Sequence, residues 1–248
     1  MKETIYHPIL GELFHVHTWR CKHAGEEQDA AYIEKAIELG ASRIVFTDHA
    51  PFPGNPFGHR MDMEQLPEYV ESLNRLKEYY KGKMELVKGL EIEYLPSFLS
   101  YYRELQVSED LDILIIGQHL YEVEPGVYSF LEADKSLEYV GLCRAMSEGI
   151  ATGLFQAVAH PDRAFRRCKE FGEEQKRVAK EVIEEAVKKR IPLEMNYSSQ
   201  QRKYNFWPQF WEMVPEEVPI LYGADAHSTE ELEEAYIAFR GKTTTPLQ

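Results

Sequence analysis

The sequence predicts an α/β barrel close to the TIM type, formed as one domain over residues 1–248. Seven short apolar runs, rich in β-branched residues, alternate with stretches of helical spacing. This alternation favours a parallel sheet that is buried on both faces. An open doubly wound sheet is the alternative on pattern alone. No glycine-rich phosphate loop follows the first run, which argues against a nucleotide-binding fold of that kind.

The predicted strands follow one another at a regular rhythm. In chain order they cover 12–17, 43–47, 84–94, 112–119, 156–160, 191–196 and 219–225. Between them, apolar residues recur every three or four positions over 32–39, 66–80 and 178–187, the spacing of helices with one buried face. Seven such strands in one domain indicate a closed barrel better than an open sheet.

Composition limits the classes of partner. Lys and Arg number 28 against 42 Asp and Glu, which gives a net charge of -14 that repels duplex nucleic acid. A small phosphorylated substrate remains compatible, because bound metal ions can dominate the charge of a pocket. No run is long enough to span a membrane, and the first residues lack a signal core. With only three scattered cysteines, we expect a cytoplasmic protein. The sequence does not indicate which oligomeric state the protein has.

Histidines gather where the predicted strands end. His7 and His59 fall outside the pattern, and the other seven lie at or just beyond a strand end. His15 and His17 are two apart, so both can point to one face of a strand and reach one ion. The remaining five are His23, His49, His119, His160 and His227. Each alone is more easily explained as a core or loop histidine.

Two carboxylates join this set. Glu91 interrupts an apolar strand beside a glycine, and a buried carboxylate is costly unless it is paired or binds a cation. A salt bridge to an arginine is the alternative for Glu91. Glu93 shares its face by period, but we expect it nearer to solvent. Asp225 lies two residues before His227 and offers the second carboxylate.

The strand ends of a parallel barrel meet at one mouth, where barrel enzymes carry their active sites. A core selected for stability has no reason to collect seven histidines there. The sequence therefore predicts a polynuclear metal site. Imidazoles with two carboxylates suit Zn, Fe or Mn better than Mg or Ca. The donors are too many for one tetrahedral ion and suffice for two or three ions.

The ligand-bearing segments also form a set of short motifs. In order they are His15-Val16-His17-Thr18, His23, Thr47-Asp48-His49, Gly89-Leu90-Glu91, Gly117-Gln118-His119, His160-Pro161 and Asp225-Ala226-His227. As a set they resemble the PHP (polymerase and histidinol phosphatase) domain family, and within it the monofunctional histidinol-phosphatases. The resemblance runs from about His15 to Ser228. It implies a distorted TIM-like (β/α)7 barrel with a trinuclear metal site.

Finer matches point to the phosphatase subgroup. They lie at 21–24, 47–51, 60–61, 76–80, 89–94 and 194–203. The sequence departs from the subgroup where Ser199-Gln200-Gln201 replaces a usual glycine, and where the chain runs only 21 residues past His227. Both departures concern substrate-facing loops or the closing helix, and they leave every ligand position filled.

The resemblance implies three divalent transition-metal ions, Zn, Fe or Mn, with the following ligands. The first would be held by His15, His17, Glu91 and Asp225. The second would be held by Glu91, His119 and His160, with Glu91 bridging the pair. The third would be held by His23, His49 and His227. Glu91 and Asp225 thereby become catalytic residues as well as ligands.

The activity implied is hydrolysis of L-histidinol phosphate to L-histidinol and phosphate, a step of histidine biosynthesis. We expect a hydroxide that bridges the first two ions to attack phosphorus. Asp48 is a candidate acid for the leaving group, or alternatively orients a ligand histidine. Arg163 and Arg202 are candidates for binding the phosphate, and Arg20 is a weaker third.

Two alternatives stay open. The first is a phosphoesterase of the same family that acts on a nucleotide, an oligonucleotide end or phosphotyrosine. The second is a non-catalytic metal-binding domain, against which the complete ligand set argues.

Overall fold

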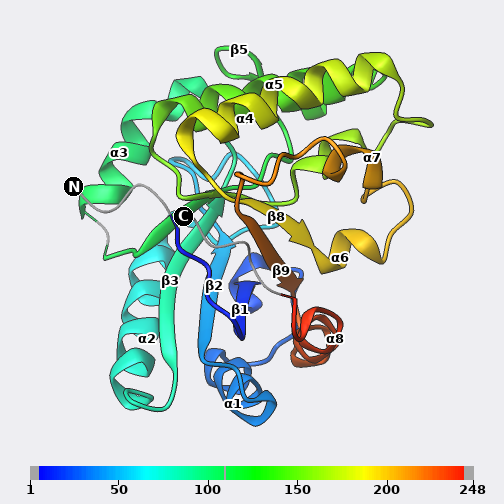
Figure 1. Cartoon of the computed structure of the whole chain (residues 1–248). Helices are drawn as coiled ribbons and strands as arrows, with labels where there is room; N and C mark the ends of the chain where they lie inside the picture. The colour runs from blue at the N-terminus through cyan, green and yellow to red at the C-terminus, as the bar shows by residue number, and fades with distance from the viewer. Residues whose placement is uncertain (1–5, 109, 243–248) are drawn as a thin grey trace.

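The computed structural model describes residues 6–108 and 110–242. Residues 1–5, which belong to the start that lacks a predicted signal core, lie outside this part. The seven predicted runs form a closed parallel barrel (Figure 1), which confirms the TIM-like (β/α)7 fold. Its strands are β1 (Glu12–Val16), β2 (Arg43–His49), β3 (Glu85–Ile92), β4 (Ile113–Ile116), β7 (Ala157–Val158), β8 (Leu193–Asn196) and β9 (Ile220–Ala226).

The barrel is distorted at its shortest and its most irregular strands. The pair β7 and β8 shares one registered residue pair, Val158 with Leu193. The register of β1 shifts against both neighbours, β2 and β9, before Val16. These irregularities fall beside His15 and His160, at the end of the barrel where the site lies.

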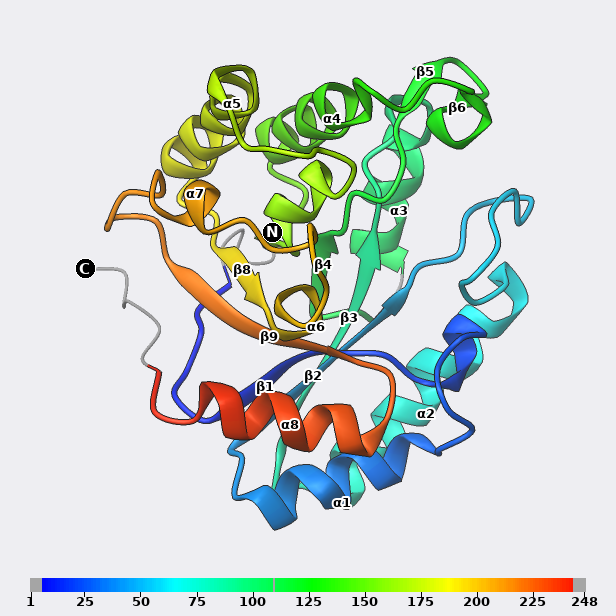
Figure 2. The same cartoon turned by 90° about the vertical axis from the view of Figure 1, so that its right-hand side faces the viewer.

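Helices surround the strands (Figure 2), with α1, α2 and α8 below and α3, α4 and α5 above in that view. The α-helices are α1 (Asp29–Leu39), α2 (Leu66–Tyr79), α3 (Leu99–Ser108), α4 (Glu138–Thr152), α5 (Glu173–Lys189), α6 (Tyr197–Gln200), α7 (Pro208–Trp211) and α8 (Thr229–Phe239). The 3-10 helices are η1 (Trp19–Cys21), η2 (Met63–Gln65), η3 (Pro96–Phe98), η4 (Ser129–Leu131) and η5 (Pro161–Phe165). The three stretches of predicted helical spacing correspond to α1, α2 and α5.

A short hairpin between β4 and α4 was not predicted. It pairs β5 (Glu122–Glu124) with β6 (Val127–Tyr128) in antiparallel fashion, outside the barrel. Its strands are too short to show an alternating pattern. Tyr128 packs edge-on against Phe57, 4.8 Å between ring centroids, so the hairpin contacts the loop that follows β2.

Alternate residues of the strands face two different cores. Odd-numbered residues of β2 and β4, such as Val45 and Ile115, belong to a small cluster inside the barrel. Even-numbered neighbours, such as Ile44 and Phe46, belong to the large cluster under the helices. The interior cluster leaves the carboxyl ends of the strands for polar side chains. Among the described residues, no helix has both the length and the low polarity needed to cross a bilayer.

One buried acid lies at the opposite end, at the start of β1. The Glu12 side chain is 4% exposed, accepts a 2.7 Å hydrogen bond from the Tyr6 hydroxyl and lies 3.3 Å from Arg43. Its Oε1 has no hydrogen-bond partner among the described residues. Burial raises the pKa of Glu12 to about 7, an effect larger than the opposing ones of Tyr6 and Arg43.

This acid predicts a pH-dependent stability. Glu12 has an ordinary pKa of 4.5 when unfolded. The folded state therefore holds an extra proton between about pH 4.5 and 7, and stability falls as the pH rises through that window. A glutamine at this position has no proton to lose. The quantity to measure is the free energy of unfolding of Glu12→Gln minus that of wild type, obtained by urea unfolding. We expect this difference to rise by roughly 1–3 kcal/mol from pH 4.5 to pH 8.

Glu85→Gln is the matched control, because Glu85 pairs with the same Arg43 but is 54% exposed. This variant keeps the buried Glu12, so its free energy of unfolding should fall over the same pH window as that of wild type. A pH-independent difference for Glu12→Gln would contradict the pKa assigned to Glu12.

Candidate metal centre

All nine predicted ligands meet at the carboxyl end of the barrel. A pocket with a volume of about 460 Å³ lies at this end, and five of the nine residues line it, namely His23, His49, His119, Asp225 and His227. The ligands come from β1 and the loop after it, from β2, β3 and β9, and from the segments that follow β4, β7 and β9. They are His15, His17, His23, His49, Glu91, His119, His160, Asp225 and His227. The convergence that the sequence predicted is thus present.

Glu91 lies at the centre and is 1% exposed. Its Oε1 is 2.8 Å from His160 Nε2 and 3.8 Å from His119 Nε2. Its Oε2 is 2.9 Å from His49 Nδ1 and 3.6 Å from His15 Nε2. Burial raises the pKa of Glu91, but the surrounding imidazoles outweigh it and hold the pKa well below its usual range. Each oxygen of this anion therefore faces a different set of donors, as a bridging ligand requires.

Asp225 closes the opposite side of this group. Its Oδ1 lies 3.2 Å from His17 Nε2 and 3.8 Å from His15 Nε2. Its Oδ2 accepts a 2.6 Å hydrogen bond from Arg163 Nη2. Arg163 and His15 outweigh the effect of burial and keep the pKa of Asp225 well below its usual range. His15, His17 and Asp225 are thus grouped as expected for one ion.

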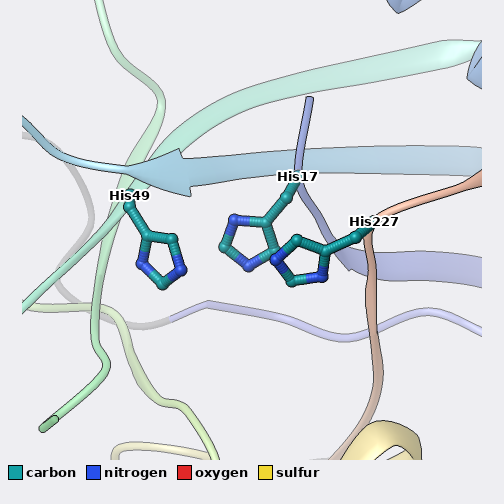
Figure 3. A group of neighbouring side chains, drawn as sticks. All are labelled: His17, His49 and His227. Carbon is teal, nitrogen blue, oxygen red and sulfur yellow. The ribbon is translucent and has the colours of Figure 1, made fainter. Parts of the chain in front are cut away.

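The outer part of the centre is built of imidazoles. His227 Nε2 is 2.9 Å from His23 Nε2. The ring of His17 lies 4.4 Å from the rings of both His49 and His227, between centroids. Figure 3 shows these last three rings gathered from different strand ends. Potential donor atoms form two groups here, one of His17, His49 and His227 and one of Cys21, His23 and His227. The set expected for the third ion was His23, His49 and His227. The structure therefore adds His17 and Cys21 to the neighbourhood of these three histidines.

The donor atoms fit divalent transition-metal ions. His15 Nε2, both ring nitrogens of His17 and Glu91 Oε2 are buried, and none of them makes a hydrogen bond of good geometry in the described part of the chain, although other site residues lie near them. Such orphaned polar atoms are costly unless something binds them. Burial lowers the pKa of His17 to about 3 and of His160 to about 4, so both rings are neutral and offer lone pairs. Neutral imidazoles with carboxylates match Zn, Fe or Mn.

Buried acids behind the ligands fix their orientation. Glu194 Oε1 lies 2.7 Å from His15 Nδ1, and its Oε2 accepts a hydrogen bond from the backbone N–H of His160. Glu93 Oε1 lies 3.1 Å from His119 Nδ1. In the sequence, Glu194 belongs to the stretch 194–203 that resembles the phosphatase subgroup, and no role is predicted for it. Its position in an otherwise apolar strand was the available signal.

The expectation that Glu93 lies nearer to solvent is wrong, because Glu93 is 1% exposed. Arg60, from the loop after β2, covers it with two hydrogen bonds of 2.9 and 3.1 Å. The guanidinium also stacks over the rings of Phe52 and Phe57. The alternation of residues along a strand does not indicate whether a distant loop covers the end of that strand, so the burial of Glu93 could not be predicted from it.

Two glycines make room for the buried acids. A Cβ on Gly117 would lie 1.9 Å from Glu91 Oε1, and a Cβ on Gly223 would lie 1.6 Å from Glu194 Oε1. Both distances are far below any van der Waals contact. These positions therefore require glycine as long as the carboxylates occupy their places.

Asp48 does not line the pocket. It is an even-numbered residue of β2, fully buried on the side that faces the helices. Its oxygens accept hydrogen bonds from the Thr18 backbone N–H and hydroxyl, at 2.7 and 2.5 Å, and one lies 4.0 Å from His17 Nδ1. This placement favours the orienting role over that of an acid for the leaving group.

The candidate arginines differ in their surroundings. Arg163 and Arg202 both line the pocket. Arg163 is held by Asp225, Ser199 and Asn196. Arg202 forms no ion pair with any residue in the described ranges. The weaker candidate, Arg20, is buried outside the pocket and bound to two acids, Asp29 and Glu68.

Sequence reasoning missed several residues of the pocket wall. They are Gly58, His59, Arg60, Ser198 and Glu231. His59 lies 5.7 Å from His23 between ring centroids and has a φ of 55°. Ser198 lies two residues beyond β8, but serine is not among the ligand types that were sought at strand ends. The others come from the loop after β2 and the start of α8, away from any strand end.

The contact between Glu194 and His15 predicts an effect on metal affinity. In Glu194→Gln, the charge that makes the His15 ring a better donor is lost. We expect metal affinity to fall about 10–100-fold, as removal of such supporting groups usually does. Titration of the metal-free protein with Zn²⁺ against a chromophoric chelator measures this.

Glu12→Gln is the control, since it removes another buried carboxylate, far from the ligands. Its Zn²⁺ affinity should equal that of wild type. Equal affinity in Glu194→Gln, with an unchanged circular dichroism spectrum, would show that Glu194 does not support the centre.

Comparison with known proteins agrees with this geometry. The PHP domain family model matches residues 14–198. A protein named probable histidinol-phosphatase from Deinococcus radiodurans is 32% identical over 161 residues, which cover 60% of this chain and 59% of the relative. The histidinol-phosphatase of Bacillus subtilis is 24% identical over 262 residues, which cover 91% of this chain and 96% of the relative.

A solved structure has the same fold. It is the crystal structure of histidinol phosphate phosphatase from Lactococcus lactis, in complex with Zn, L-histidinol and phosphate. The TM-score is 0.68 at 21% identity, over 95% of this chain and 97% of the other. Since the family model covers most of the chain, from within β1 into α6, the chain belongs to the PHP domain family.

Proposed function

We propose that this protein is a metal-dependent phosphomonoesterase that hydrolyses L-histidinol phosphate to L-histidinol and phosphate. The observation that carries the proposal is the cluster of nine ligands beneath a pocket whose wall presents guanidinium groups. The names of the relatives support the choice of substrate, and so does the ligand pair in the Lactococcus structure. The activity would serve histidine biosynthesis.

The chain supplies the framework for this reaction. Bound divalent ions would activate water and neutralise charge on the phosphoryl oxygens. Glu91 holds its negative charge at the centre, where its two oxygens face separate groups of imidazoles. Asp225 faces His15 and His17 and is itself oriented by Arg163. Neither carboxylate needs to gain or lose a proton during the reaction, since the surrounding histidines hold the pKa of Glu91 well below its usual range and Arg163 does the same for Asp225.

The two arginines have different parts in phosphate binding. Two nitrogens of Arg163 are engaged by Ser199, Asn196 and Asp225, so this residue mainly orients Asp225 and can offer only its remaining N–H groups. Arg202 follows α6 on the pocket wall without an ionic partner among the described residues. We assign the bidentate contact to phosphate to Arg202. Asp48 orients the loop that carries His17 through Thr18.

The cytoplasm is the compartment that we propose. All three cysteines are free, and Cys21 and Cys143 are buried, which suits a reducing environment. The net charge of -14 favours a small substrate over duplex nucleic acid.

Phosphate release from L-histidinol phosphate tests the proposal. The purified protein should turn over this substrate with kcat/KM of about 10⁴ M⁻¹s⁻¹ or more, and a chelator should abolish the activity. A parallel panel holds a nucleotide, an oligonucleotide with a terminal phosphate, phosphotyrosine and p-nitrophenyl phosphate.

Stronger turnover of another physiological ester in the panel would overturn the substrate and keep the hydrolase. No turnover of any ester by the metal-loaded protein would instead support a non-catalytic domain.

A further inference from the structure

The pocket wall carries a carboxylate that the proposed reaction does not use. Two carboxylates line the pocket, Asp225 and Glu231. Asp225 is neutralised by Arg163, 2.6 Å away. Glu231 forms no ion pair with any residue that the structure describes, and it is exposed at the rim. The rim therefore presents an uncompensated negative charge above a site that binds an anion.

The position of Glu231 is fixed by the start of α8. Its backbone N–H donates to the Ser228 side chain, and its Oε2 accepts a 2.7 Å hydrogen bond from the backbone N–H of His227. These two hydrogen bonds, one to Ser228 and one from His227, hold the carboxylate beside a candidate ligand histidine. One oxygen is used by the backbone, and Oε1 has no hydrogen bond to the described residues. An exposed oxygen of fixed position is suited to bind a cationic group of a ligand.

Arg202 provides the complementary charge on the same wall. Both Arg202 and Glu231 line the pocket, yet no ion pair joins them. Since the guanidinium and the carboxylate are not paired with each other, both are available to a ligand that carries a phosphate and a separate ammonium group. A ligand with further negative charges would be repelled at the Glu231 side.

We infer that Glu231 determines specificity by binding the ammonium group of a phosphorylated amino alcohol. The inference rests on the proposed function and assigns the residue that selects for the amine of that substrate. Arg202 binds the phosphate end, and Glu231 binds the amine across the pocket. Other phosphate esters that lack a cation lose this contact and retain the metal centre.

Kinetics with a matched pair of substrates test this inference. The pair is L-histidinol phosphate and 3-(imidazol-4-yl)propyl phosphate, which lacks only the amine. The variant is Glu231→Gln, whose amide oxygen still accepts the hydrogen bond from His227. We expect its KM for L-histidinol phosphate to rise about tenfold, with kcat within about twofold, because a hydrogen bond to a charged group is lost. The KM for the analogue should change far less.

Glu230→Gln is the control. Glu230 is the neighbouring exposed acid in the first turn of α8 and does not line the pocket. The Glu230→Gln substitution removes one negative charge from the same helix end as Glu231→Gln does. Its kinetics should match those of wild type on both compounds.

Equal losses of Glu231→Gln on both compounds would show that Glu231 acts only through the backbone of His227, and would overturn the inference. An unchanged KM for L-histidinol phosphate would overturn it too. If wild type hydrolyses neither compound, the proposed function fails. The inference is then decided by inhibition of p-nitrophenyl phosphate hydrolysis, in which Glu231→Gln should weaken only the inhibitor that carries the amine.

Discussion

The ionised carboxylate of Glu91, buried at the carboxyl end of the barrel, is the constraint on which the rest of the site depends. An isolated charge in such a place is costly, and it is tolerated only among partners that favour the anion. Imidazoles from several strand ends supply that surrounding, and Gly117 leaves the space that the side chain needs. Their unpartnered nitrogens in turn require cations. One carboxylate thus links the choice of glycine, the gathering of histidines and the fit to metal ions.

The backbone is strained where these ligands leave their strands. His15, His160 and Asp225 have φ values of 69°, 31° and 53°, in a region that residues other than glycine rarely adopt. Each such residue costs about 1–3 kcal/mol and persists only when its surroundings fix it. Glu194 supplies part of that fixation, since it contacts the His15 ring and the His160 backbone together. The strain and its supports lie at the same end of the barrel as the metal centre.

Whether the position of a site residue could be predicted from the sequence depended on the element that carries it, a strand end, a loop or a helix start. The convergence of the nine candidate ligands was predictable, because parallel strands bring their carboxyl ends to one mouth and the histidines stand at those ends. The placement of Asp48 followed from the same alternation that puts His49 inside the barrel, and it could have been inferred. Arg60 and Glu231 come from a loop and a helix start. Their approach to the pocket depends on tertiary packing, which no strand period records.

The metal content of the protein as purified tests the central claim most directly, that the nine side chains form one polynuclear centre. Inductively coupled plasma mass spectrometry should find about three transition-metal ions per chain in the wild type, in line with the number of donors. Glu91→Ala, which removes the shared carboxylate, should lose at least about two of them while it keeps its circular dichroism spectrum. An active wild type with about one ion or none, or a Glu91→Ala variant with its full metal content, would contradict the account.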